Sequence, residues 1–271
     1  MQNNGKIKKL VNVLFVAMAV LTAAMIVASI VNASKRKQAF NIPEDIELVQ
    51  LETLRGNISD DAMITVISTE YGDMAAELYP QFAPETVENY KSLSESGYYD
   101  GTFIYEVEKG IHLGGGCVYN DGSLPDGYDK SIETVGPEIS KNLWPVKGAI
   151  MSCGLTHTTL WRGQETYSGS RFLISGSIEF TDEIKNQMLD MQGNTKVADM
   201  FIEYGGTPNV SQQITVFAQI FDGWDVLDAL LDVQTEESTL KPVQDTEITG
   251  TRVCTYREYV ESKEKNEQDE K

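Results

Sequence analysis

The sequence has few cysteines and histidines, which limits the chemistry available to it. Its 271 residues include three cysteines (Cys117, Cys153 and Cys254) and two histidines (His112 and His157). An odd number of cysteines at irregular spacing does not form a disulfide framework, although one disulfide with a spare thiol stays open. Neither residue type has the spacing of a zinc site, so no metal is predicted. Because no glycine-rich loop leads into a phosphate-cradling helix, no cofactor is predicted either.

Basic residues are scarce outside the N-terminus. The net charge is −19, with 41 acidic and 22 basic residues. The first 37 residues nevertheless carry six Lys or Arg and no acid, so the rest of the chain is strongly acidic. An acidic surface repels phosphate backbones, and we therefore predict no nucleic-acid partner. We attribute the acidity to solubility.

One long hydrophobic run comes after a short N-terminal tail, residues 1–9. Leu10–Val31 contains no charged residue, and a helix of that length spans a hydrocarbon core of about 30 Å. We interpret residues 10–31 as a transmembrane helix or uncleaved signal anchor. A cleavable signal peptide stays open because Val31–Ala33 fits a small-residue cleavage site. We favour the anchor because the run exceeds the usual apolar stretch of about 7–15 residues in signal peptides.

The orientation of this segment cannot be derived from its flanks, because basic residues lie at both ends and the positive-inside rule gives no answer. A lone N-terminal span usually exports the part of the chain that is C-terminal to it. The expectation is therefore a membrane-anchored, extracytoplasmic domain, or a secreted one if the segment is cleaved.

The remainder divides by its patterning. Residues 32–61 are polar and acidic and predict a stalk or linker, with a helical turn around 46–54 at most. Beyond them lie many short segments rich in β-branched residues, separated by glycines, which predict strands. Amphipathic helices are predicted near 84–96, where Pro84 stands at a helix start, and near 222–232. Two helices among many strands favour a mainly β closed barrel over an alternating α/β sheet, although the pattern alone also allows a sandwich.

Two further segments differ from these strands. Residues 179–206 have helical periodicity and are interpreted as an insertion within the domain. Residues 258–271 mix charges of both signs, and this composition predicts a charged, disordered tail.

Several blocks of the sequence resemble cyclophilin-type peptidyl-prolyl cis-trans isomerases, in the same order. They are APETVENYKSLSESGYYDGT, KGAIMSC, GSRFLIS, GGTP and ITVFAQIFDGWDVLDAL. The resemblance covers residues 62–257. It implies a closed antiparallel β-barrel capped by two α-helices, isomerisation of X-Pro peptide bonds, and Pro-containing polypeptides as partners.

The resemblance also implies which positions form the active site, and most of them carry other residues here. The family's Phe-His-Arg-Val run aligns with Ile104–Val107, so the catalytic arginine's position holds Glu106. The other positions implied in substrate binding or catalysis hold Ile111, His112, Gly114, Cys153, Arg171, Phe172, Leu173, Asn209, Val210 and Ile214. Of these, only Phe172 keeps the family's residue.

The replacements bear directly on the chemistry. Rotation about an X-Pro bond has a barrier of about 20 kcal/mol, which an isomerase lowers with a donor aimed at the twisted amide. An ionised Glu106 accepts hydrogen bonds only. Arg171 is a possible stand-in donor, but we favour an ion pair in which Arg171 and Glu106 approach within about 4 Å. The predicted function is an isomerase homologue that assists the folding of exported proteins, with activity weak or lost. The alternative is a non-catalytic module that binds a Pro-containing segment or partner protein at the membrane surface.

Overall fold

The computed structural model describes residues 46–124, 134–159, 163–190 and 195–269. The predicted transmembrane segment, residues 10–31, lies outside these ranges. Within them, no helix is both long and apolar enough to cross a bilayer.

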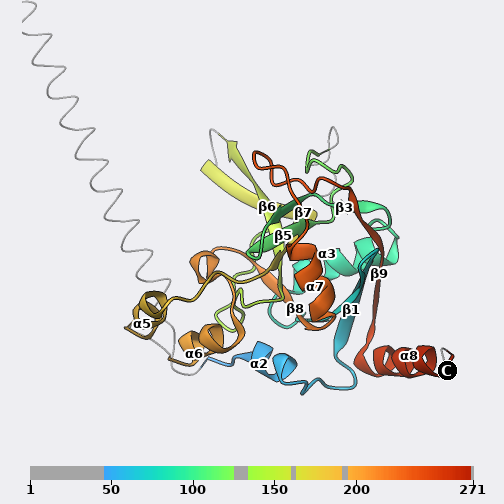
Figure 1. Ribbon diagram of the computed structural model, residues 1–271, viewed down its shortest axis with the longest axis horizontal. Coiled ribbons are helices and arrows are strands. Elements are labelled where there is room, and N and C mark those ends of the chain that lie inside the picture. The colour runs from blue at the N-terminus through green and yellow to red at the C-terminus, as the bar shows by residue number, and fades with distance from the viewer. Residues whose placement is uncertain (1–45, 125–133, 160–162, 191–194, 270–271) are drawn as a thin grey trace, which may run out of the picture. The chain divides into compact units, whose positions relative to one another are not determined.

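The strands of the described residues form one antiparallel sheet of nine strands that curls into a nearly closed barrel (Figure 1). The order is β3-β9-β1-β2-β8-β6-β7-β5-β4. The edge strands β3 and β4 are separated in the chain by Tyr105 alone, and Phe103 bridges to Cys117 just after β5. The predicted mainly β barrel is therefore confirmed. The strands are β1 (Met63–Thr69), β2 (Gly72–Leu78), β3 (Thr102–Ile104), β4 (Glu106–Glu108), β5 (His112–Gly115), β6 (Ala149–Thr159), β7 (Gly163–Ser175), β8 (Val216–Asp222) and β9 (Thr246–Thr255).

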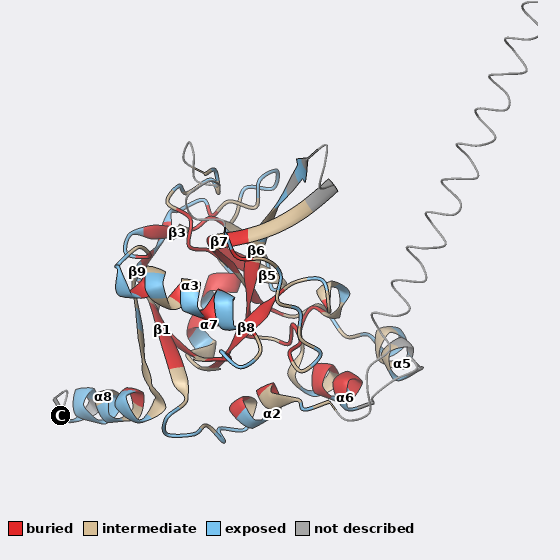
Figure 2. Cartoon of the chain, turned by 180° about the vertical axis from the view of Figure 1, so that it is seen from behind, coloured by how far each residue is buried: buried red, intermediate tan, exposed pale blue. Residues whose placement is uncertain are grey.

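Alternation along the strands fills the barrel with one set of side chains. Phe172 and Ile174 of β7 join Phe217 of β8 in a single buried cluster. Two helices pack against this cluster, as Figure 2 shows by their buried faces. They are α3 (Pro84–Glu95), which has proline in its first turn, and α7 (Trp224–Leu231). Both predicted helices are confirmed. The second starts two residues later than predicted, because Gly223 adopts a left-handed φ of 85° just before it.

The predicted stalk is partly wrong, because its end belongs to the folded domain. Helix α2 (Val49–Leu54) lies against β8, and Gln50 is completely buried. Its amide donates to the Trp144 carbonyl at 2.9 Å and to Gln219 Oε1 at 2.8 Å. Its oxygen accepts from the Trp144 N–H at 2.6 Å. A buried amide satisfied in this way fixes the segment to the barrel.

Helices occupy much of residues 179–206, the segment interpreted as an insertion. It contains α5 (Asp182–Asp190) and α6 (Thr195–Tyr204), and a short 3₁₀ turn, η1 (Pro208–Val210), comes after it. Phe201 of α6 is buried with its ring edge-on to Trp144, at a centroid distance of 6.4 Å. The insertion is therefore attached by apolar packing.

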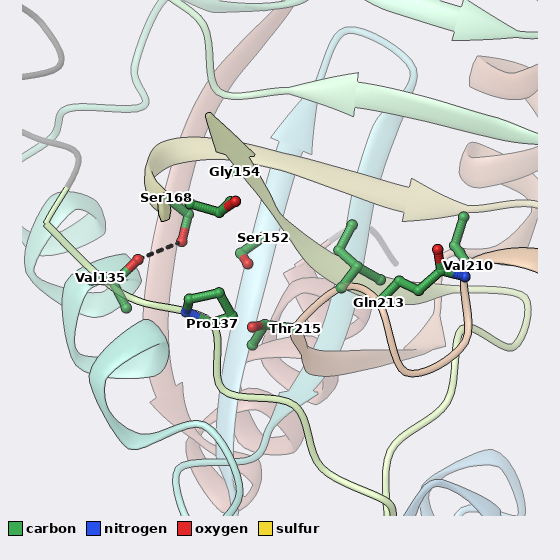
Figure 3. A pocket seen from close by; sticks show the side chains of 10 residues that line it. Val135, Pro137, Ser152, Gly154, Ser168, Val210, Gln213 and Thr215 are labelled. Carbon is green, nitrogen blue, oxygen red and sulfur yellow. Dashed lines mark hydrogen bonds between the residues drawn. The ribbon is translucent and has the colours of Figure 1, made fainter. Parts of the chain in front are cut away.

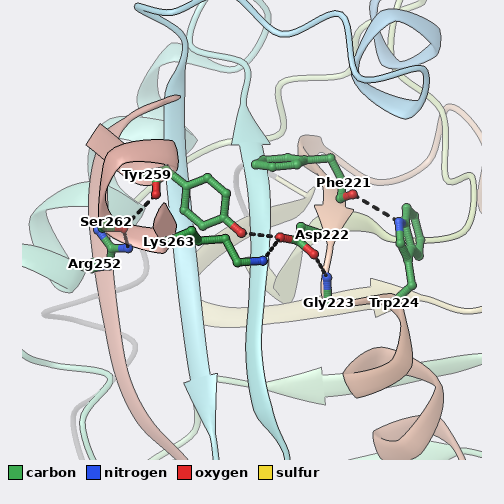
Figure 4. A network of polar contacts seen from close by, with 8 residues as sticks. All are labelled: Phe221, Asp222, Gly223, Trp224, Arg252, Tyr259, Ser262 and Lys263. Atoms are coloured by element: carbon green, nitrogen blue, oxygen red, sulfur yellow. Dashed lines mark hydrogen bonds and ion pairs between the residues drawn. The ribbon is translucent and has the colours of Figure 1, made fainter. Parts of the chain in front are cut away.

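The predicted disordered tail is wrong, because α8 (Tyr256–Asp269) occupies it. Tyr259 packs on Ile64 of β1, and its ring meets that of Phe221 at 5.5 Å. Its hydroxyl and the Lys263 ammonium both reach the Asp222 carboxylate (Figure 4). The prediction rested on the charged composition of the segment and overlooked the apolar residues at the start of the helix. These residues pack against the barrel and hold the helix in place.

Candidate functional site

The positions implied by the resemblance lie mostly on the outside of the barrel, over β4, β5 and β7. Glu106 of β4 is opposite Gly114 of β5, and Gly114 is opposite Leu173 of β7. Val107 and Leu113, next to them in the chain, point into the buried core. We call this outer surface the substituted face, and its residues are Tyr105, Glu106, His112, Gly114, Cys153, Arg171 and Leu173.

Glu106 pairs with a histidine. Its carboxylate lies 3.6 Å from His112 Nε2, while His112 Nδ1 lies 3.4 Å from Glu108. The predicted ion pair with Arg171 is wrong, because no contact within 4.0 Å joins these two described side chains. The ring of Tyr105 takes the place beside the guanidinium instead. The family's arginine position therefore holds a hydrogen-bond acceptor, and the described side chain beside its carboxylate is His112.

Arg171 is nearly buried on the same face, with 9% of its surface exposed. Its Nη1 donates to the Gly122 carbonyl at 3.3 Å. Its guanidinium lies over the Tyr105 ring, 5.9 Å from the ring centroid, which is within the range of a cation–π contact. Arg171 therefore brings a permanent positive charge to the substituted face.

Tyr105 is the residue of this face that sequence reasoning missed. Only 6% of it is exposed, and its hydroxyl donates to Cys153 Sγ at 3.6 Å. Burial, followed by the nearby Cys153 and Glu106, raises the pKa of the phenol well above its usual range. The hydroxyl therefore stays protonated. Glycine at position 114, whose carbonyl accepts a hydrogen bond from the Tyr105 N–H, was the available signal for a large ring in this place.

A second group of implied positions forms an aliphatic wall. Leu173, Val210 and Ile214 pack on one apolar cluster, together with Met151 and Val216. Val210 and Ile214 also line a pocket of about 250 Å³ (Figure 3). Its other residues are Val135, Pro137, Ser152, Gly154, Thr166, Ser168, Gln213 and Thr215. The described residues of this lining offer apolar surface, hydroxyl groups and an amide, and none of them carries a charge.

Three implied positions lie elsewhere. The assignment of Phe172 to substrate binding is corrected, because strand alternation turns its ring into the barrel beside Tyr99, at a centroid distance of 5.9 Å. Asn209 is exposed on η1, where its carbonyl accepts from Gln213 Nε2 at 2.8 Å. Ile111 lies in the β4–β5 turn and accepts a backbone hydrogen bond from Gly176 at 2.7 Å. Among the described residues, no three His, Cys, Asp or Glu side chains are grouped to hold a metal ion.

Comparison with known proteins places this barrel among isomerase relatives. The family profile described as cyclophilin type peptidyl-prolyl cis-trans isomerase/CLD matches residues 64–253. Candidate peptidyl-prolyl cis-trans isomerases of Staphylococcus epidermidis and Staphylococcus haemolyticus are each 29% identical over 193 residues. These alignments cover 71% of this chain and 92% and 91% of the two relatives.

Solved structures similar to the chain include a cyclophilin-type isomerase of Cryptosporidium parvum. Its structure in the presence of the dipeptide Ala-Pro has a TM-score of 0.48 and 22% identity, covering 71% of this chain and 99% of that one. A second structure of the same protein gives 0.49 and 23%, with 72% and 98% covered.

Proposed function

Because the chain belongs to the cyclophilin-type peptidyl-prolyl cis-trans isomerase family, we propose that it acts on Pro-containing polypeptides with isomerase activity that is weak or lost. Its role is to assist the folding of exported proteins at the outer surface of a membrane. The observation that carries the proposal is Glu106, which stands at the family's arginine position and pairs with His112 at 3.6 Å.

The chemistry is a matter of charge. Twisting the X-Pro amide localises the nitrogen lone pair, and a cationic donor aimed at that amide lowers the barrier. Glu106 carries the opposite charge and accepts hydrogen bonds. By analogy with oxyanion-hole donors, losing one such group costs about 10²–10³ in rate. Arg171 is the one arginine on the substituted face as described, and any residual activity is assigned to it.

The cellular location rests on the N-terminal sequence. Residues 10–31 are uncharged over a length that spans a bilayer, and an anchored barrel would meet chains as they leave the membrane. N-terminal sequencing of the mature protein tests this part. A chain that begins at Ser34 would instead support a cleaved signal peptide.

A non-catalytic binding module is the second candidate. The aliphatic wall of Leu173, Val210 and Ile214 favours it, because these replacements still present apolar surface although the donor position has changed. Apolar surface of this kind holds a proline ring without requiring turnover.

An isomerase assay on residues 38–271 tests the proposal. The fragment retains α2, whose Gln50 is fixed to the barrel. We expect turnover of a short Pro peptide at least about 100-fold slower than by a cyclophilin with the intact arginine. Turnover at the ordinary cyclophilin level would contradict the proposal, and binding without turnover would select the second candidate.

A further inference from the structure

We propose that Tyr105 is an intramolecular occupant of the substituted face, which a Pro-containing segment must displace in order to bind. The inference rests on the proposed function, because it names what controls access to that same site. Four residues contact or approach the Tyr105 ring and hydroxyl: Gly114, Gly122, Cys153 and Arg171. Three of these stand at positions that the resemblance assigns to the family's active site.

Two glycines make room for the ring. A Cβ atom added to Gly114 would lie 2.7 Å from Tyr105 Cζ and 2.8 Å from its hydroxyl oxygen. A Cβ added to Gly122 would lie 2.7 Å from Tyr105 Cδ2. Real Cβ atoms do not approach carbon so closely, so any side chain at position 114 displaces the ring, together with the Glu106 side chain, whose Cγ would lie 2.8 Å away. The family's glutamine at position 114 and the ring of Tyr105 therefore exclude one another.

The contacts that hold the ring are weaker than those of the tyrosines inside the barrel. The Tyr105 hydroxyl donates to Cys153 Sγ at 3.6 Å, and the Arg171 guanidinium lies over the ring at 5.9 Å from its centroid. Tyr99, by contrast, donates to the Ser170 carbonyl at 3.0 Å and touches the rings of Tyr90 and Phe172. Thiols are weak acceptors, so leaving this site breaks no strong hydrogen bond. Tyr105 is therefore more easily displaced than Tyr99.

The vacated space suits the backbone beside a proline whose ring rests on the aliphatic wall. The proline nitrogen carries no hydrogen, so this backbone leaves no donor unpaired over Gly114. If the ring of Tyr105 is displaced in about 1–10% of molecules, the apparent affinity for such a segment is reduced about 10- to 100-fold. Removing the Tyr105 ring should therefore raise the apparent affinity for the segment by the same factor of about 10 to 100.

The test uses the full-length chain in mild detergent and its Tyr105→Ala variant. Calorimetric titration with an Ala-Ala-Pro-Phe peptide should give an affinity at least about 10-fold higher for the variant. Maleimide labelling of Cys153, measured by mass spectrometry and normalised to Cys254 of the same chain, should become several-fold faster. Cys254 lies on β9, away from the substituted face, and serves as the internal control.

Matched variants separate the ring from other effects. Tyr105→Phe keeps the ring and should label like the wild type, as should Tyr71→Ala, which removes an exposed tyrosine from the β1–β2 turn. Should Tyr105→Ala fail to fold, Gly114→Ala displaces the ring by its methyl group and should accelerate labelling in the same way.

The outcomes are distinct. Unchanged labelling of Cys153, or equal peptide affinity in wild type and Tyr105→Ala, overturns the inference. Faster labelling with no peptide binding by either chain supports Tyr105 as the cover of this face and contradicts the proposed function.

Discussion

The inward-facing and outward-facing residues of one strand differ in how closely they match the family. On β7, Phe172 points inward and meets Tyr90 and Tyr99 edge-on, whereas its neighbours Arg171 and Leu173 face outward and replace the family's residues. The interior forms one continuous buried cluster, while the exterior holds a carboxylate at the family's arginine position, a guanidinium at another substituted position and the ring of Tyr105. The barrel depends on its interior and catalysis depends on its exterior, so one can change while the other stays.

The largest expected effect lies inside. Phe172→Ala removes a ring that is 1% exposed and should lower the free energy of unfolding by about 3–5 kcal/mol, because it leaves a cavity among close-packed rings. Leu173→Ala, one residue along and half-buried, should cost no more than about 2 kcal/mol. Urea unfolding of both variants measures the contrast. If both variants lost the same free energy of unfolding, the distinction between the two faces would be wrong.

An intermediate effect concerns the docking of α8. Although burial raises it, hydrogen bonds from Lys263 and Tyr259 hold the pKa of Asp222 below its ordinary value of 3.8. A lowered carboxyl pKa stabilises the folded state above the unfolded pKa, and this contribution disappears as the pH falls through the folded pKa.

Asp222→Asn should therefore lower the free energy of unfolding at pH 7 by about 1 kcal/mol, a modest value because the carboxylate is partly exposed. Well below pH 3.8, the difference from wild type should disappear. Thermal unfolding across this pH range measures it, with Glu264→Gln on the exposed side of α8 as the control. A difference that grows toward acid pH would contradict the assignment.

The smallest effect is expected on the substituted face. Because Glu106 pairs with the partly exposed His112 rather than with Arg171, a double-mutant cycle of Glu106→Gln and Arg171→Gln should be additive within about 0.3–0.5 kcal/mol. The Glu106→Gln change alone should cost less than about 1 kcal/mol. A coupling energy of about 2 kcal/mol or more between the two positions would restore the direct ion pair.

Local patterns and the resemblance together predicted the barrel and its helices. Pro84 at a helix start and strands of β-branched residues are signals carried by neighbouring residues, and the barrel and both capping helices could be predicted from them together with the ordered blocks. The resemblance likewise located the substituted face, because equivalent residues of one barrel fall on equivalent strands. Glu106, Gly114 and Leu173 are neighbours across the sheet for this reason.

The features that could not be predicted depend on contacts between distant residues. Gln50 is polar and typical of a stalk, and its amide is satisfied by Trp144 and Gln219, which lie 94 and 169 positions away. The tail has the composition of a disordered segment, yet Tyr259 contacts Asp222, 37 positions earlier. Tyr105 stands next to Glu106 in the chain, but its role depends on the space left by Gly114 and Gly122. Amino-acid composition does not predict which of these distant residues contact one another.

The central claim is that an intact barrel carries a substituted face, and restoring that face tests it most directly. The measurement is the isomerase kcat/KM of a triple variant, Tyr105→His, Glu106→Arg and Gly114→Gln, in residues 38–271. Replacing the Tyr105 phenol with the smaller imidazole frees space that a glutamine at position 114 needs. We expect a small gain from Glu106→Arg alone and at least about a 10-fold gain from the triple variant, because a donor returns to an accessible face. A folded triple variant with the activity of the wild type would contradict the account.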